Sequence, residues 1–199
     1  MIQGYQIRRV IIVLVAVALL VFLVAAVAGL LRNSLNGGNA DATPDDTTLV
    51  LTDYDNDTSR LRLTYDGRII ANEQRRSLRI TISADERVFE LLRGYDGQAV
   101  TRKTYPNTSA AYQNMIRAAN FEGFATSQNN SLGDDERGVC PAGQRTIAEL
   151  FDEREVVSRL WSASCGRKLG SLGGDSRALL RLFQAQIPDY RELTRGVRF

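Results

Sequence analysis

Residues 138–166, with the sequence GVCPAGQRTIAELFDEREVVSRLWSASCG, contain both cysteines of the 199-residue chain. Between Cys140 and Cys165 lie two runs with the composition of β-strands, QRTIAELF and EVVSRLWS, which are separated by a charged turn around Asp152 and Glu153. In a hairpin centred between those two acids, Cys140 lies opposite Cys165. The stretch therefore predicts a β-hairpin whose open end is closed by a Cys140–Cys165 disulfide, a bond that persists in oxidising compartments.

Other uses of two cysteines do not fit this spacing. A C-x-x-C redox pair requires closer cysteines, and a zinc site requires more ligands than the chain supplies here. The acids Asp53, Asp55 and Asp57 resemble the start of a calcium loop, but Thr58 stands where that loop requires glycine and Thr64 where it requires glutamate. We predict a hairpin turn at these acids, and neither a metal nor a cofactor for the chain.

The complete absence of histidine removes most familiar catalytic sites. Ser-His-Asp triads, Cys-His dyads and histidine metal sites all need that side chain. Neither lysine follows a serine at the spacing of a Ser-Lys dyad. Pairs of carboxylates remain, and these suffice for glycoside hydrolysis. Three acidic clusters offer such pairs, although each lies where exposed turn residues are expected: Asp53, Asp55 and Asp57; Asp134, Asp135 and Glu136; Glu149, Asp152, Glu153 and Glu155. The chain is not predicted to be an enzyme.

The N-terminal region predicts a membrane anchor. Residues 10–31 are apolar throughout, and a helix of this length matches the hydrocarbon core of a bilayer. Arg8 and Arg9 precede this run, so the positive-inside rule places residues 1–9 in the cytoplasm. A cleaved signal peptide is the alternative, because Ala26-Val27-Ala28 has the small-x-small pattern of a processing site. The predicted location is the plasma membrane, with the C-terminal part outside.

The rest of the chain predicts a stalk and one α+β domain. Residues 32–46 are polar and contain Gly37-Gly38 and Pro44, which is typical of a flexible linker, and residues 47–199 are long enough to fold. We expect strands at 48–54, 60–65, 68–72, 77–82 and 99–105, followed later by the hairpin. Three helices are expected: one at 83–94 that begins with a Ser83–Glu86 capping box, one through Tyr112, Met115, Ile116 and Ala119, and one through Leu179, Leu182, Phe183 and Ile187.

Alternation along the expected strands separates two faces. Leu61 and Leu63 belong to the core, whereas Arg60 and Arg62 point to the opposite face, together with Arg79 of the later strand. Arg60, Arg62 and Arg79 are the candidate partner-binding residues, and the polar loop 122–138 is a second candidate contact region. Gly170, Gly173 and Gly174 precede a helix, where a phosphate could bind, but the acidic cap and the spacing favour a plain loop.

These features predict a non-catalytic binding or assembly module at the cell surface. Its partners are the lipid bilayer, through residues 10–31, and an unidentified extracytoplasmic protein or polymer. Nucleic acid is not an expected partner, because 25 basic residues nearly balance 23 acidic ones. A carboxylate-dependent hydrolase of surface polysaccharide is the first alternative. The second is a filament subunit, since the order of apolar helix, antiparallel sheet and late disulfide resembles that of type IV pilin-like proteins.

Overall fold

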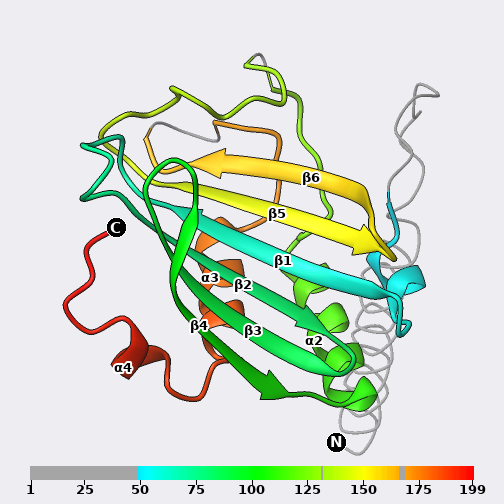
Figure 1. Ribbon diagram of the computed structural model, residues 1–199. Helices are drawn as coiled ribbons and strands as arrows, with labels where there is room; N and C mark the ends of the chain where they lie inside the picture. The colour runs from blue at the N-terminus through cyan, green and yellow to red at the C-terminus, as the bar shows by residue number, and fades with distance from the viewer. Residues whose placement is uncertain (1–48, 131, 166–168) are drawn as a thin grey trace, which may run out of the picture. The chain divides into compact units, whose positions relative to one another are not determined.

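A six-stranded antiparallel sheet, in the order β4-β3-β2-β1-β5-β6, forms the framework of the computed structural model, which describes residues 49–130, 132–165 and 169–199 (Figure 1). In chain order the elements are the 3-10 helix η1 (Leu51–Tyr54), β1 (Ser59–Asp66), β2 (Arg76–Ser83), β3 (Glu86–Arg93), β4 (Gln98–Pro106), α2 (Ser109–Phe121), β5 (Arg145–Asp152), β6 (Glu155–Ala163), α3 (Ser176–Gln184) and α4 (Tyr190–Leu193). The predicted α+β class, with an antiparallel sheet and a disulfide, is confirmed for this part of the chain.

The central strand β1 has the two faces that its alternation predicts. Leu61 and Leu63 are buried, whereas Arg60 and Arg62 are partly exposed. Leu61 pairs with Ile82 on β2 and with Leu150 on β5, so apolar side chains from three neighbouring strands meet on one side. Because successive side chains of a strand point to opposite sides, this pairing fixes the core on one face and the arginines on the other.

Helices α2 and α3 cover the core face of the sheet (Figure 1). The Thr108 hydroxyl accepts a hydrogen bond from the Ala111 amide at the start of α2, and Asp175 accepts two at the start of α3, so each helix has a capped N-terminus. The residues predicted for the apolar side of α2 are all buried, and so are Leu179, Phe183 and Ile187. The prediction of α2 is confirmed. The last predicted helix is confirmed up to Gln184, where α3 ends, and Ile187 lies beyond it.

The predicted helix at 83–94 is wrong, because this segment is strand β3. Val88 and Leu92 face one side of the sheet, Phe89 and Leu91 face the other, and all four are buried. A strand buried on both faces has the same run of apolar pairs as a helix. The Ser83 hydroxyl does accept a hydrogen bond from the Glu86 amide at 3.3 Å, as in a capping box, but here this bond closes the turn between β2 and β3.

Two predicted strands are also wrong. Within residues 48–54, the described part contains η1 instead of a strand, and its Leu51 enters the core beside α2. Residues 68–72 form an irregular connection between β1 and β2, with no ladder pairing. This connection and the turn between β3 and β4 lie at one end of the sheet, near the start of β5.

The predicted disulfide between Cys140 and Cys165 is confirmed, with 5.8 Å between the Cα atoms, but the predicted register of the hairpin is wrong. The turn consists of Glu153 and Arg154, one residue beyond the predicted centre, and a bulge follows it. Neither cysteine belongs to the ladder, which ends at Arg145 and Ala163. A tight turn after Cys140 brings its sulfur back to Cys165, and the Gly143 amide donates to the Cys140 carbonyl at 3.0 Å in this turn.

The predicted cytoplasmic tail (1–9), membrane span (10–31) and stalk (32–46) lie outside the described residues. Among the helices that the structure describes, none combines the length and the apolar character that crossing a bilayer requires.

We predict that a Cys140→Ser/Cys165→Ser double variant is less stable than the oxidised protein by about 3 kcal/mol, because opening a loop of this size returns conformational entropy to the unfolded chain. Urea unfolding followed by circular dichroism measures the difference. Reduced wild-type protein is the matched control and should unfold like the variant. Equal midpoints for the oxidised wild type and the variant would contradict the prediction.

Candidate functional site

The face of the sheet opposite α2 and α3 carries most of the charged strand residues, and we call it the charged face. Its members come from all six strands of the sheet: Arg60, Arg62, Arg79, Glu90, Arg102, Glu149 and Arg159. They face one side because cross-strand partners of an antiparallel sheet share a face. The three predicted partner-binding arginines therefore lie on the same surface, as their alternation predicts.

Arg60 and Arg62 both lie over the Phe151 ring. Their guanidinium carbons are 4.9 and 4.4 Å from the ring centroid, distances typical of cation–π contacts. Arg62 also lies 3.8 Å from Glu149. Burial lowers the pKa of the Arg62 guanidinium, Glu149 opposes that effect, and the neighbouring Arg79 and Arg60 add to it. The fixed ring thus holds two cations close together on the surface.

Acidic residues on this face lie between arginines. Glu90 accepts from Arg102 at 2.7 Å and lies 3.8 Å from Arg79. Glu149 lies 3.8 Å from both Arg62 and Arg159. Each glutamate is therefore shared by two arginines, and five arginines on the charged face are matched by two glutamates. The surface retains an excess of positive charge.

A cavity of about 420 Å³ opens at the end of the charged face where β1 and β3 end and β2, β4 and β5 begin. Two rungs of cross-strand partners form its floor: Arg145, Asp66, Ser77 and Leu92 in the first, and Ile147, Thr64 and Arg79 in the second. Loops supply the walls, with Ile69 and Arg75 before β2, Tyr95 and Gly97 before β4, and residues 136–138 before β5. Arg79 is the member of the predicted trio that reaches this cavity.

The buried carboxylate of Asp66 is the centre of the floor. One oxygen accepts from the Ser77 hydroxyl at 2.6 Å and from Arg75, and the other accepts from Nε and Nη2 of Arg145 at 3.1 and 2.8 Å. The side chains of Asp66, Arg75 and Arg145 are 12%, 11% and 3% exposed. Two guanidinium groups thus surround one carboxylate, and the buried cluster has one more positive than negative charge.

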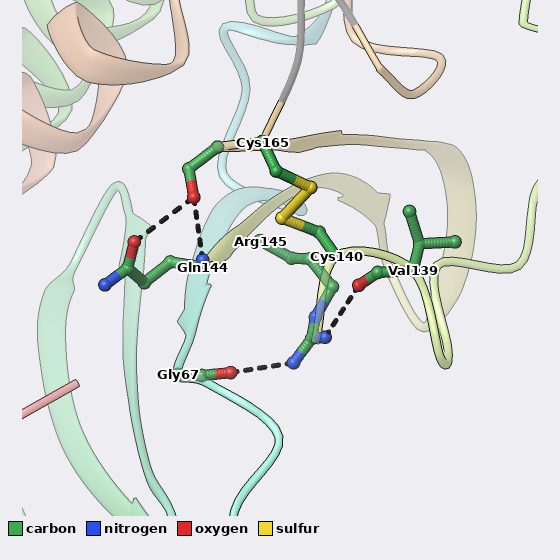
Figure 2. Close-up of a disulfide and its surroundings, with 7 residues drawn as sticks. Gly67, Val139, Cys140, Gln144, Arg145 and Cys165 are labelled. Carbon is green, nitrogen blue, oxygen red and sulfur yellow. Dashed lines mark hydrogen bonds between the residues drawn. A yellow bond between two sulfur atoms is a disulfide. The ribbon is translucent and has the colours of Figure 1, made fainter. Parts of the chain in front are cut away.

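Arg145 also fixes the backbone around the disulfide. Its Nη1 donates to the Val139 carbonyl at 3.0 Å, and its Nη2 donates to the Gly67 carbonyl at 2.7 Å (Figure 2). Val139 immediately precedes Cys140. The disulfide, the start of β5 and the end of β1 are therefore connected through a single buried side chain.

The cavity walls hold their own cations in place. The Arg75 guanidinium carbon lies 4.3 Å from the Tyr95 ring centroid, and Arg75 Nη1 donates to the Gly94 carbonyl at 2.9 Å. On the opposite wall, Glu136 accepts from Arg159 at 2.7 Å. Hydrogen bonds from the exposed Arg137 lower the pKa of Asp135 to about 2. Part of the predicted contact region 122–138 thus folds over the charged face.

Arg79 differs from the other arginines of the cavity. Its guanidinium makes no hydrogen bond to any residue that the structure describes, and its Nε atom is buried without an acceptor. The Thr64 hydroxyl, directly opposite on β1, has no such partner in the described ranges either. Arg75 Nε is a second buried donor without an acceptor. The second rung therefore offers donors toward the cavity that this part of the chain does not use.

The predicted acidic clusters are distributed over several places. Asp53 belongs to η1, and the Asn56 side chain organises the following turn by accepting from the amides of Thr58 and Ser59. Glu136 reaches the cavity, Glu149 lies on the charged face, and Asp152, Glu153 and Glu155 surround the β5–β6 turn. Within residues 49–130, 132–165 and 169–199, no three potential ligands lie close enough to hold a metal ion.

The glycines before α3 have a packing role. A side chain on Gly174 would meet the Gly123 carbonyl oxygen at 2.4 Å, and one on Gly170 would meet the Trp161 carbonyl oxygen at 2.1 Å. Close approach of backbone segments therefore requires both glycines. This geometry supports the plain loop that the sequence favours over a phosphate site.

The sequence pattern does not single out the residues at the centre of the cavity. Asp66 lies at the alternating positions of Arg60, Arg62 and Thr64, which indicates that it shares their face of the sheet. The following Gly67, however, makes Asp66 resemble a turn residue. Arg75 lies in an irregular connection, and no periodicity marks its direction. Arg145 was placed within a strand, but its face depends on a register that the sequence did not fix.

No protein-family model matches this chain, and no curated protein sequence matches it significantly.

We predict that Asp66→Asn lowers the free energy of unfolding by about 3 kcal/mol or more, because it leaves two buried guanidinium groups without their counter-ion. Chemical denaturation measures this loss. Glu73→Gln removes an exposed acid from the connection between β1 and β2 and should change stability by less than about 0.5 kcal/mol. Similar stabilities for the two variants would show that the Asp66 cluster is not a stabilising element.

Proposed function

We propose that the protein is a non-catalytic binding module whose charged face contacts an acidic partner outside the cell. The observation that carries this proposal is the excess of arginine on that face, where four arginines share two glutamates and a fifth, Arg60, lies over the Phe151 ring. Electrostatic complementarity guides association and selects partners by charge. An extracytoplasmic protein or polymer that carries regularly spaced carboxylates fits such a surface.

The Arg60–Phe151–Arg62 contact supports this use of the face. Phe151 is 6% exposed and cannot move freely, so the two guanidinium groups that lie over its ring are held in position before a partner arrives. Ordering a flexible arginine costs conformational entropy during binding. A surface whose cations are already ordered by packing loses less conformational entropy on association. This supports a binding role for Arg60 and Arg62.

The proposed location combines the N-terminal sequence with the disulfide. An anchor at residues 10–31 and a stalk at residues 32–46 would hold the domain near the outer surface of the plasma membrane, with residues 1–9 in the cytoplasm. The Cys140–Cys165 bond supports this location, because structural disulfides are rare in reducing compartments.

The cavity chemistry favours binding over hydrolysis of polysaccharide. Asp66 and Glu136 both line the cavity and are the two acids that a carboxylate-dependent hydrolase could use there. Such an enzyme needs both acids to face the glycosidic bond. Here both acids are held by arginine, since Asp66 accepts hydrogen bonds from Arg145 and Glu136 accepts one from Arg159 on the charged face.

The binding proposal predicts that the Arg60→Ser/Arg62→Ser double variant captures acidic polymers about tenfold less well than the wild type, because charge-assisted contacts are lost. The measurement is retention of the full chain, in detergent, on immobilised poly-L-glutamate and polygalacturonate, with neutral dextran as a blank. Retention of the wild type should also fall at high salt.

The matched control is Arg117→Ser/Arg181→Ser. It removes the same net charge from the exposed sides of α2 and α3, the two helices that cover the opposite face of the sheet. Retention of this control should equal that of the wild type. Equal losses in the two double variants would assign the binding to net charge alone and would refute a role for the charged face.

The location predicts that Cys140 and Cys165 react with a membrane-impermeable thiol reagent in intact cells only after reduction. Mass spectrometry of the labelled protein measures the reaction. Cells treated without reductant are the control for the disulfide, and lysed cells are the control for access. Labelling that requires lysis would place the domain on the cytoplasmic side and refute the proposed topology.

A further inference from the structure

We propose that the cavity at the end of the charged face binds a small organic molecule with a single carboxylate, which Arg79 and Thr64 hold on the second rung of the floor. This inference deepens the proposed function. It rests on that function for one point, namely that the charged face is the side of the domain that meets ligands.

The donor arrangement on the second rung is the first argument. Thr64 and Arg79 are direct cross-strand partners on β1 and β2, and both line the cavity. Arg79 is 33% exposed in its side chain and lies 3.8 Å from Glu90, a distance beyond hydrogen bonding. A guanidinium group presents paired N–H donors that match the two oxygens of a carboxylate. A neighbouring hydroxyl can donate to the same group.

The charge of the first rung is the second argument. Asp66 with Arg75 and Arg145 forms a buried cluster with a net positive charge, and Arg75 Nε has no acceptor in the described part of the chain. Burying charge without compensation is unfavourable. An anion in the cavity next to this cluster would offset that cost, so the protein should bind anions there in preference to neutral molecules of the same shape.

The acids in the cavity limit the charge of the ligand. Asp66 lies in the floor, Glu136 lies in the wall, and Glu90 faces Arg79 from β3. The negative charges of these three acids repel a second anionic group on the ligand. A ligand whose single carboxylate binds Arg79 places no other negative charge near them. Carboxylate monoanions therefore fit the site better than phosphate dianions.

The remaining surface of the cavity is suited to an apolar body. Leu92 and Ile147 are buried in the floor on either side of the polar residues, and Ile69 and Tyr95 form part of the walls. A volume of about 420 Å³ lies in the range of small-molecule sites. Apolar walls with a few convergent polar groups are typical of such sites. We expect a ligand with a compact ring or a branched chain behind its carboxylate.

The test is an NMR titration of the full chain in detergent micelles with benzoate, benzamide and inorganic phosphate. Benzoate should bind saturably and should shift the side-chain Nε–Hε resonance of Arg79. Benzamide, which has nearly the same shape without the charge, controls for partition into the micelle and should not bind. Phosphate should bind more weakly than benzoate.

Three variants assign the contact. Arg79→Ser should weaken benzoate binding about tenfold or more, because it removes a charge-assisted pair of hydrogen bonds. Arg79→Lys keeps the charge without the paired donors and should have an intermediate affinity, which also guards against misfolding of the serine variant. Arg102→Ser is the matched control, because Arg102 binds the same Glu90 but does not line the cavity.

Each other result overturns the inference. Benzoate binding that is unchanged in Arg79→Ser, benzamide binding equal to benzoate binding, or phosphate binding tighter than benzoate binding would do so. Retention on poly-L-glutamate separates this inference from the proposed function. If wild-type retention depends on Arg60 and Arg62 while benzoate does not bind, only the carboxylate site is wrong; if benzoate binds through Arg79 without polymer retention, only the proposed function is wrong.

Discussion

The buried ion pair between Asp66 and Arg145 is the constraint on which the cavity end of the domain depends. These residues are direct partners on β1 and β5, and Arg145 extends the connection to the Val139 carbonyl beside the disulfide. Ser77 and Arg75 complete the shell of Asp66 from β2 and from the connection before it. A buried carboxylate needs such partners, so one charge dictates how three strands, one loop and the disulfide-linked segment meet.

This arrangement accounts for the cavity above it. Long side chains that converge on a buried acid cannot also fill the space over the sheet. The Ile69 amide of the β1–β2 connection donates to the Pro141 carbonyl at 2.9 Å, so the two loops that contribute Arg75 and Val139 are joined beside the cavity. The disulfide then fixes the segment before β5, which carries the wall residues 136–138. Packing thus produces a polar floor, partly apolar walls and a cation, Arg79, that the cluster does not use.

The spacing of apolar residues predicts those strands and helices that bury only one of their sides. Alternation in β1 separated Leu61 and Leu63 from Arg60 and Arg62, and helical spacing identified α2, because each element buries a single side. The same logic failed for β3, where Val88 and Phe89 are buried on opposite sides of the sheet. Two buried faces remove the alternation, and the remaining run of apolar residues has no feature that separates strand from helix.

The site was less predictable than the fold because its residues converge through register. The expected oxidising compartment and the presence of two cysteines were enough to predict the disulfide. The actual β5–β6 pairing is shifted from the predicted register, and the turn after Cys140 brings the two cysteines together despite this shift. Alternation along the strand assigns Arg79 to the charged face. It does not assign Arg79 to the cavity, because the cavity depends on Thr64 being the cross-strand partner of Arg79 and on loops that have no periodic pattern. The partner of a charge on a sheet is set by strand order and register, and both are properties of the whole domain. A sequence therefore identifies which side of a strand a functional arginine occupies before it can identify what that arginine faces.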